Sequence, residues 1–155
     1  MTEQPPRPAA RRKADALALL RRDAGDVWVA TASADETVRA HLVPLSMGWL
    51  DDERVVIAIK PTARTGRDLL EHRTARLAVG PTRDVVMIDA VLDEVHDVGD
   101  APAAISEGFL RQADWDPRGS AGYAYFVLRP VTVQAWREAD EIAGRTLMRE
   151  GRWLV

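Results

Sequence analysis

Cysteine is absent from this chain of 155 residues. Without thiols the protein cannot form a disulfide framework, bind a metal through thiolates or use a cysteine nucleophile. No stretch approaches the ~18 consecutive apolar residues that suggest a membrane-spanning helix. A basic excess is missing too, because 21 Lys and Arg face 24 Asp and Glu and leave a formal net charge of −3. These gaps argue against a membrane protein and against nucleic acid as a partner, and we expect a cytoplasmic location.

Motifs for several chemistries are also missing. The sequence has no Walker-type phosphate loop, no dinucleotide glycine fingerprint and no serine-centred nucleophile motif. His41, His72 and His96 lack metal-ligand spacing, so we expect no metal site. His41 lies among apolar residues of a predicted strand, which favours a packed, hydrogen-bonded side chain over a catalytic one. If the protein is an enzyme, a cofactor carries the chemistry, and we assign no catalytic residue.

What is present is the composition of one globular domain, with 46% hydrophobic and 29% charged residues. Residues 1–11 combine prolines with charge, which predicts a disordered tail. Residues 12–138 hold the regular patterns and form the predicted domain. Residues 139–155 are too apolar for a disordered end. We therefore expect them to dock on the domain or on a dimer partner.

Hydrophobic periodicity predicts a mainly β fold with a few short helices. Short sequential connections favour an antiparallel barrel of six strands. The run 54–60 is almost continuously apolar, typical of a strand buried on both faces. Pro44 in the second strand indicates an edge, a bulge or a backbone that faces a ligand. The predicted strands cover 26–34, 38–50, 54–60, 76–80, 84–98 and 123–136, with a hairpin turn at Asp35 and Glu36 and with helices at 12–23, 62–72 and 103–113.

The most informative segment is IAIKPTARTGRDLL, residues 57–70. A buried strand ends at Lys60, and Thr62 is a good N-cap for the helix that follows. A helix N-terminus presents unpaired amides and the positive end of the helix dipole. Three cations and two hydroxyls gather here with no acid among them: Lys60, Thr62, Arg64, Thr65 and Arg67. This chemistry suits a phosphate monoester. A solvated helix start in an arginine-rich chain is the alternative.

The order of these motifs resembles the pyridoxamine 5′-phosphate oxidase-like, FMN-binding split β-barrel family. The resemblance rests on VWVATASADETVRAHLVPLSMGWLDDERVVIAIKPTARTGRDLLEHRTARLAVG, followed by TRDVVMIDAVLDEV, WDPRG and RPVTVQAWRE. The shared order is a strand, a turn, a strand with a proline, and a strand that ends in a cationic helix start. Together the segments cover roughly residues 14–138.

The resemblance implies a homodimer of six-stranded antiparallel split β-barrels, with FMN in the dimer clefts. The phosphate would bind the five residues named above, from Lys60 to Arg67. Trp136 and Arg137 match the family's C-terminal aromatic-basic pair and would reach the cofactor across the dimer interface, although Trp136 also suits a core position. Five tryptophans are more than one small barrel readily buries. The isoalloxazine ring would lie against the second strand, near Val43, Pro44, Leu45 and Ser46.

Some positions depart from the family pattern. Ala63 stands where the family often has Ser, and Asp68 where it often has Asn, so we expect weaker phosphate binding. The extended Arg- and Lys-bearing motif of the true pyridoxamine-phosphate oxidases is missing, so that activity is not expected. The arginine- and alanine-rich composition is typical of a high-GC bacterium. The resemblance implies an FMN-dependent oxidoreductase that transfers hydride between the flavin and a small organic substrate. A deazaflavin-dependent reductase and a non-catalytic flavin- or haem-binding protein remain as alternatives.

Overall fold

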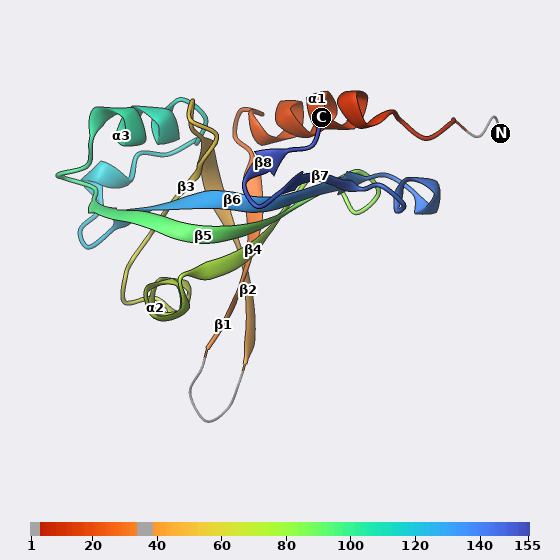
Figure 1. Ribbon diagram of the computed structural model, residues 1–155. Helices are drawn as coiled ribbons and strands as arrows, with labels where there is room; N and C mark the ends of the chain where they lie inside the picture. The colour runs from red at the N-terminus through yellow and green to blue at the C-terminus, as the bar shows by residue number, and fades with distance from the viewer. Residues whose placement is uncertain (1–3, 34–38) are drawn as a thin grey trace.

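The structure is a computed structural model that describes residues 4–33 and 39–155. The described residues form three α-helices around one antiparallel sheet of eight strands (Figure 1). The predicted hairpin turn at Asp35 and Glu36 lies outside the described residues. The helices are α1 (Ala9–Leu20), α2 (Arg64–His72) and α3 (Ala103–Leu110). The strands are β1 (Asp26–Ala32), β2 (Ala40–Trp49), β3 (Val55–Ile59), β4 (Thr74–Val79), β5 (Val85–Asp97), β6 (Ala124–Trp136), β7 (Thr146–Arg149) and β8 (Arg152–Trp153).

The first six strands close into a barrel. Their order is β3-β2-β1-β4-β5-β6, and β3 also pairs with β6. Strand β6 changes partner along its length, because residues 124–128 pair with β3 while Val133 and Gln134 pair with β7. The barrel is therefore closed over one half of β6 and extended by β7 and β8 over the other. This arrangement confirms the predicted mainly β, six-stranded antiparallel split barrel.

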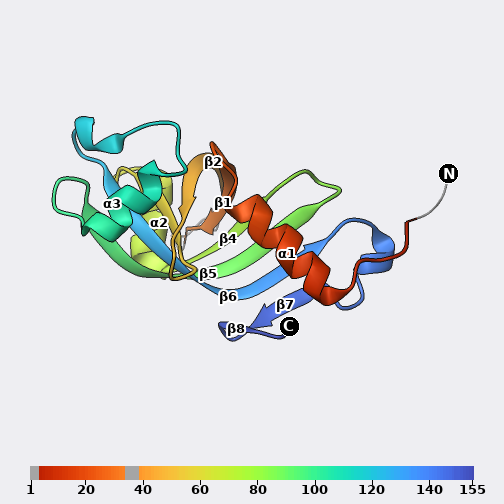
Figure 2. The ribbon, with the colours of Figure 1, turned by 90° about the horizontal axis from the view of Figure 1, so that it is seen from above.

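Two apolar clusters hold the barrel together. The larger one fills the interior and includes Leu20 from α1 and Leu69 from α2, so both helices cover the barrel core. The smaller one lies between α3 and the outer side of β3 and β6, where Phe109 packs against Tyr125. All five residues of β3 are buried, which confirms the prediction of a strand covered on both faces. Seen from above, α1 and α3 lie over the same side of the sheet, over different strands (Figure 2).

The N-terminal segment is part of the folded domain. Helix α1 begins at Ala9, and Arg7 is buried against Glu141, which lies in a short 3₁₀ turn after β6. The prediction of a disordered tail over residues 1–11 is therefore wrong for residues 7–11. That tail was expected because proline and charge do not form a core, but Arg7 is held by ion pairs with residues far along the chain.

The C-terminal segment adds two strands to the sheet. Strand β7 pairs with β6, and β8 pairs with β7. The Trp153 indole N–H donates to the Glu53 carboxylate at 2.7 Å, and the Lys13 ammonium lies 4.8 Å from the Trp153 ring centre. Residues 146–153 are thus docked on the barrel of their own chain. Among the described helices, none combines the length and the apolar character needed to span a membrane.

Candidate functional site

The strand-to-helix corner (residues 60–67, called the corner below) connects β3 to α2. Gly66 brings the first turn of α2 against the end of β3, because a Cβ at this position would lie 2.6 Å from the Lys60 carbonyl oxygen. The N-cap residue is Ala63, which has no side-chain cap, so the prediction of Thr62 as the N-cap is wrong. The amides of residues 64–66 precede the first i to i−4 bond of the helix, from Arg67 to Ala63. Among the described residues no side chain caps these amides, so the corner offers amide donors at the positive end of the α2 dipole.

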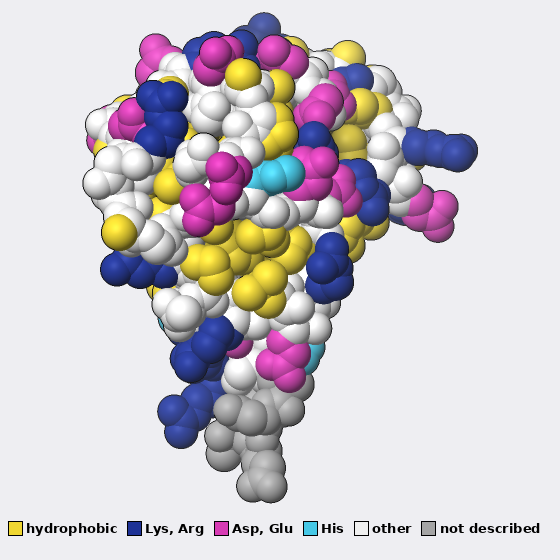
Figure 3. All heavy atoms as spheres, turned by 90° about the vertical axis from the view of Figure 1, so that its left-hand side faces the viewer, with side chains coloured by type: hydrophobic (Ala, Val, Ile, Leu, Met, Phe, Trp, Pro, Cys, Tyr) yellow, Lys and Arg dark blue, Asp and Glu magenta, His cyan; other side chains and the backbone are white. Residues whose placement is uncertain are grey.

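Three of the predicted phosphate-binding side chains face solvent. Lys60, Thr62 and Arg67 are exposed. The Lys60 ammonium lies 5.6 Å from the centre of the Tyr123 ring, and within residues 4–33 and 39–155 Arg67 forms no side-chain hydrogen bond or ion pair. Seen from the side of α2 and α3, the surface carries a hydrophobic patch with Lys and Arg side chains at its lower left (Figure 3). Cations and an apolar surface thus occur together on this face.

The other two residues predicted to bind the phosphate, Arg64 and Thr65, form hydrogen bonds at the end of the barrel. The Arg64 Nε–H donates to Asp68 Oδ2 at 3.2 Å. The Thr65 hydroxyl is 3.1 Å from His41 Nε2, which agrees with the prediction that His41 is packed and hydrogen-bonded. Asp68 also accepts a hydrogen bond from the Thr31 hydroxyl at 2.8 Å. These contacts place the corner beside the ends of β1 and β2.

The predicted ring-binding segment of β2 lies near the corner. His41, which contacts α2, precedes Val43 by two residues, or ~7 Å along a strand. Val43 and Leu45 pack against the barrel core, whereas Pro44 is exposed and Ser46 is partly exposed. Residues 40–46 of β2 pair with β1 alone, because β3 pairs only with Met47 to Trp49. Pro44 therefore lies where β2 has an open edge, a position that tolerates a missing N–H.

Trp136 and Arg137 lie away from the corner in the same chain. Ala124, at the start of β6, pairs with Ile59, which precedes Lys60, whereas Trp136 ends β6. At ~3.3 Å per residue this separation is roughly 40 Å along the strand. The Arg145 guanidinium lies 5.6 Å from the Trp136 ring centre, and Arg137 forms an ion pair with Asp84 at 3.5 Å. One chain therefore does not bring these two residues to the five predicted phosphate contacts of the corner.

A sheet surface on the barrel exterior (called the outer face below) is apolar and uncovered. Cross-strand pairing places Pro44 of β2, Trp28 of β1 and Ala78 of β4 in one row, and Leu42, Ala30 and Arg76 in the next. Trp28 is 49% exposed and Leu42 is 59% exposed. Such exposure is unusual for large apolar side chains on neighbouring strands. The alternating pattern of β1 indicates a strand with one outward side, but the sequence does not show that this side is uncovered.

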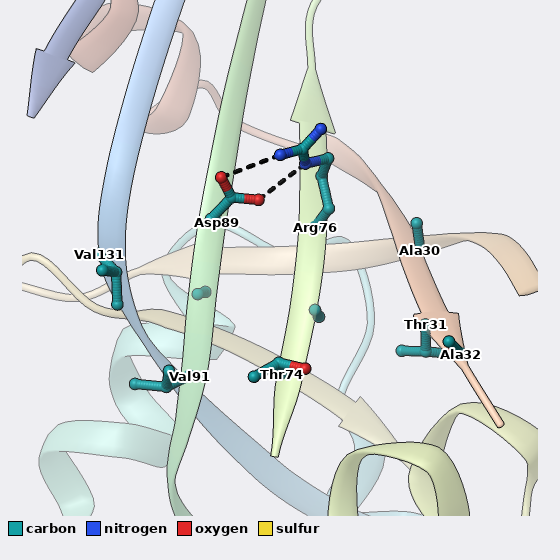
Figure 4. A pocket seen from close by; sticks show the side chains of 10 residues that line it. Ala30, Thr31, Ala32, Thr74, Arg76, Asp89, Val91 and Val131 are labelled. Atoms are coloured by element: carbon teal, nitrogen blue, oxygen red, sulfur yellow. Dashed lines mark hydrogen bonds and ion pairs between the residues drawn. The ribbon is translucent and has the colours of Figure 1, made fainter. Parts of the chain in front are cut away.

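A hollow of about 520 Å³ opens on the outer face. It is floored by small side chains of β1 and β4, and Figure 4 shows an ion pair on one side of it. There Arg76 donates to both oxygens of Asp89 at 2.7 and 3.1 Å, which raises the pKa of Arg76. Sequence reasoning did not identify this hollow. The lining residues are Ala30, Thr31, Ala32, Thr74, Ala75, Arg76, Asp89, Ala90, Val91 and Val131.

Sequence reasoning also missed the contacts made by Asp68, although its position was noted. Arg64 and Asp68 are four residues apart, a spacing at which helical side chains meet, so this pair could have been found. The bond from Thr31 could not, because it joins β1 to α2 across the barrel end. In the part of the chain that is described, no group of three or more His, Cys, Asp or Glu residues is arranged to hold a metal.

No family model and no curated protein matches the sequence. Solved structures do match its fold. The heme binding protein from Mycobacterium smegmatis is 20% identical with a TM-score of 0.64, and the match covers 94% of this chain and 59% of that one.

Two further matches cover most of the other chain. An F420 reductase is 15% identical with a TM-score of 0.54, over 75% of this chain and 93% of that one. A protein named for pyridoxamine 5′-phosphate oxidase, from Listeria innocua, is 10% identical with a TM-score of 0.59, over 81% and 98%. At these identities the likeness establishes a shared fold.

Proposed function

We propose that this chain, which has the split β-barrel fold found in pyridoxamine 5′-phosphate oxidase-like and F420 reductase-like structures, binds FMN and transfers hydride between the flavin and a small organic substrate. The observation that carries the proposal is the corner. The amides of the first turn of α2 and the exposed cations Lys60 and Arg67 lie in this segment, near residues 43–46 of β2, where we place the ring. A dianionic phosphate attached to a flat apolar ring suits that combination.

The residues present fit the phosphate of FMN. The amides of the first turn of α2 and the Thr62 hydroxyl supply neutral donors, and Lys60 and Arg67 supply charge. Charge-assisted hydrogen bonds of this kind are stronger than neutral ones. Bound FMN would supply the hydride-accepting ring, while the residues of this chain hold and orient it.

The outer side of β2 fits the ring. Val43 and Leu45 are fixed by the barrel core, so the strand between them is rigid. Pro44 then presents a flat apolar side chain to the ring, and Ser46 presents a hydroxyl. The open edge of β2 leaves room for a ring where a neighbouring strand would otherwise lie.

The outer face supports a homodimer as part of the proposal. Trp28 and Leu42 form an exposed apolar surface on adjacent strands, and a second copy of the chain can cover it. Obligate dimers commonly bury more than ~2,000 Å² in this way. In such a dimer, Trp136 of the partner subunit and Arg137 of the partner subunit would complete the cofactor site, which one chain leaves without them.

Titration of the protein with FMN and with riboflavin tests the phosphate contact. We expect Arg67→Ala to weaken FMN binding about tenfold, because one charge-assisted hydrogen bond is lost. Riboflavin, which lacks the phosphate, should bind both proteins equally. Arg22→Ala is the control, because Arg22 is an exposed arginine outside the corner. If Arg67→Ala changes neither ligand, or both alike, the corner does not bind the phosphate.

The absorbance spectrum of the protein purified from its native host tests which cofactor it carries. A flavin spectrum supports the proposal. The fold shared with an F420 reductase favours a deazaflavin as the first alternative, and the fold shared with a heme binding protein favours haem as the second. A deazaflavin or haem spectrum would replace FMN in the proposal.

Sedimentation at micromolar concentration tests the dimer. We expect a dimer for the wild type and a monomer for Trp28→Glu, because the substitution places a charge in the middle of the outer face. A wild-type monomer would exclude a site completed by the partner subunit.

A further inference from the structure

We propose that Asp68 lowers the preference of the corner for a phosphate monoester over a phosphate diester, by neutralising Arg64. The inference rests on the proposed function, because it concerns the phosphate of the bound flavin. A monoester carries about −1.5 to −2 charges at pH 7, and a diester carries one. A fixed carboxylate at the corner therefore repels the monoester more strongly than the diester.

Asp68 is a buried charge. Its residue is 3% exposed and lies one helical turn after Arg64 on α2. Its Oδ2 atom accepts from the Thr31 hydroxyl at 2.8 Å and from Arg64 Nε at 3.2 Å. Both donors hold the carboxylate at the barrel end.

Arg64 belongs to the same hydrogen-bond network. Its Nη2 atom donates to the Ser33 hydroxyl at 3.1 Å and to the Arg39 carbonyl at 3.3 Å. Nε and Nη2 are thus occupied, and within residues 4–33 and 39–155 Nη1 makes no hydrogen bond, so Nη1 is the nitrogen that can approach a ligand. A single nitrogen cannot form the two-pronged contact by which arginine recognises phosphate best.

The charge of the corner follows from this pairing. Within the described part of the chain Lys60 and Arg67 form no ion pair, whereas the charges of Arg64 and Asp68 cancel. Coulombic repulsion between Asp68 and a ligand is proportional to the ligand charge. The free-energy cost that Asp68 imposes on a dianionic monoester is therefore about twice the cost for a diester.

Three flavins that share one ring test the inference: FMN, the monomethyl ester of its phosphate, and riboflavin. Asp68→Asn keeps the size of the side chain and an acceptor oxygen but removes the charge. We expect about tenfold tighter binding of FMN, about threefold tighter binding of the ester, and riboflavin affinity within about twofold of wild type. Glu71→Gln is the matched control, because Glu71 is an exposed carboxylate on the same helix. It should change none of the three affinities by more than about twofold.

A second set of variants tests whether the pair acts as a neutral unit. Arg64→Gln alone leaves Asp68 uncompensated and should weaken FMN binding about tenfold. The double variant Arg64→Gln with Asp68→Asn removes both charges and should return FMN affinity to within about twofold of wild type. Because it leaves no unpaired buried charge, the double variant also remains informative if Asp68→Asn alone folds poorly.

The outcomes separate this inference from the proposed function. If FMN binds wild type better than riboflavin does, but Asp68→Asn changes FMN and its ester equally, the inference about Asp68 is wrong and the phosphate site stands. A double variant as weak as Arg64→Gln also overturns it, because Arg64 then binds the phosphate directly. If FMN and riboflavin bind wild type equally, the phosphate site and the inference both fail.

Discussion

Glu141 supplies the acceptor that fixes the N-terminal segment, and we expect Glu141→Gln to destabilise the protein by about 3 kcal/mol at pH 7. Arg7 donates from Nε and Nη2 to the two Glu141 oxygens at 2.9 and 2.8 Å, and Glu141 is 2% exposed. The side-chain bond from Arg7 is the main cause that lowers the pKa of Glu141 from 4.5 to about 2, against the opposing effect of burial. At about 1.36 kcal/mol per pKa unit, that drop corresponds to about 3 kcal/mol.

The pH dependence has a definite sign. A carboxylate whose pKa is lowered on folding stabilises the protein above its unfolded pKa of 4.5, and this stability is lost as the pH falls toward 2. Urea unfolding of both proteins measures the effect. We expect the difference in the free energy of unfolding between wild type and Glu141→Gln to shrink from about 3 kcal/mol at pH 7 to roughly 1.5 kcal/mol at pH 3.

Glu138→Gln is the matched control, because Glu138 forms an exposed ion pair with Arg83 at 2.8 Å. Exposed pairs contribute about 0–1 kcal/mol, so the control should stay close to wild type. A difference for Glu141→Gln below about 1 kcal/mol at pH 7, or one that does not change between pH 7 and pH 3, would refute the reasoning.

Three further predictions concern single side chains. Arg64→Ala should lower the free energy of unfolding of the ligand-free protein by about 1–3 kcal/mol, because Asp68 stays buried and loses a charged partner. Chemical denaturation measures this loss, and an unchanged unfolding midpoint would contradict the prediction. Gly66→Ala should destabilise the protein by about 1–3 kcal/mol, because the alanine Cβ would press against the Lys60 carbonyl oxygen. A thermal unfolding midpoint equal to that of wild type would show that α2 shifts freely to make room. Trp153→Phe should lower the free energy of unfolding in urea by about 1 kcal/mol, because the Glu53 carboxylate loses its indole donor. An unchanged free energy of unfolding would mean that water replaces this donor.

Local patterns predict much of the barrel. Val55 to Ile59 form a continuous apolar run, and a strand covered on both faces needs that composition. Pro44 was expected at an edge, at a bulge or on a backbone that faces a ligand, and β2 has an open edge there. The helix start at the corner was placed within two residues, because its hydrophobic pattern and its turn residues lie close together in the sequence.

Side-chain partners far along the chain could not be predicted. Arg7 and Glu141 are 134 residues apart, so nothing near Arg7 shows that it is buried. The inward position of Arg64 depends on Asp68, and that of Thr65 depends on His41 across the barrel end. The cofactor roles assigned to the corner, to β2 and to Trp136 and Arg137 stay predictions, because they concern a bound group and a second subunit.

The pairing of β3 with the first part of β6 has a consequence for synthesis of the chain. Strand β3 is apolar on both faces, and one of its edges pairs with residues 124–128, which leave the ribosome about 70 residues later. Until then that edge has unpaired N–H and C=O groups, and an unpaired apolar edge is prone to pair with other chains. The barrel can close only after most of the polypeptide has been made. Chaperones that bind exposed strands would therefore act on the nascent chain after β3 has been synthesised and before β6 has been.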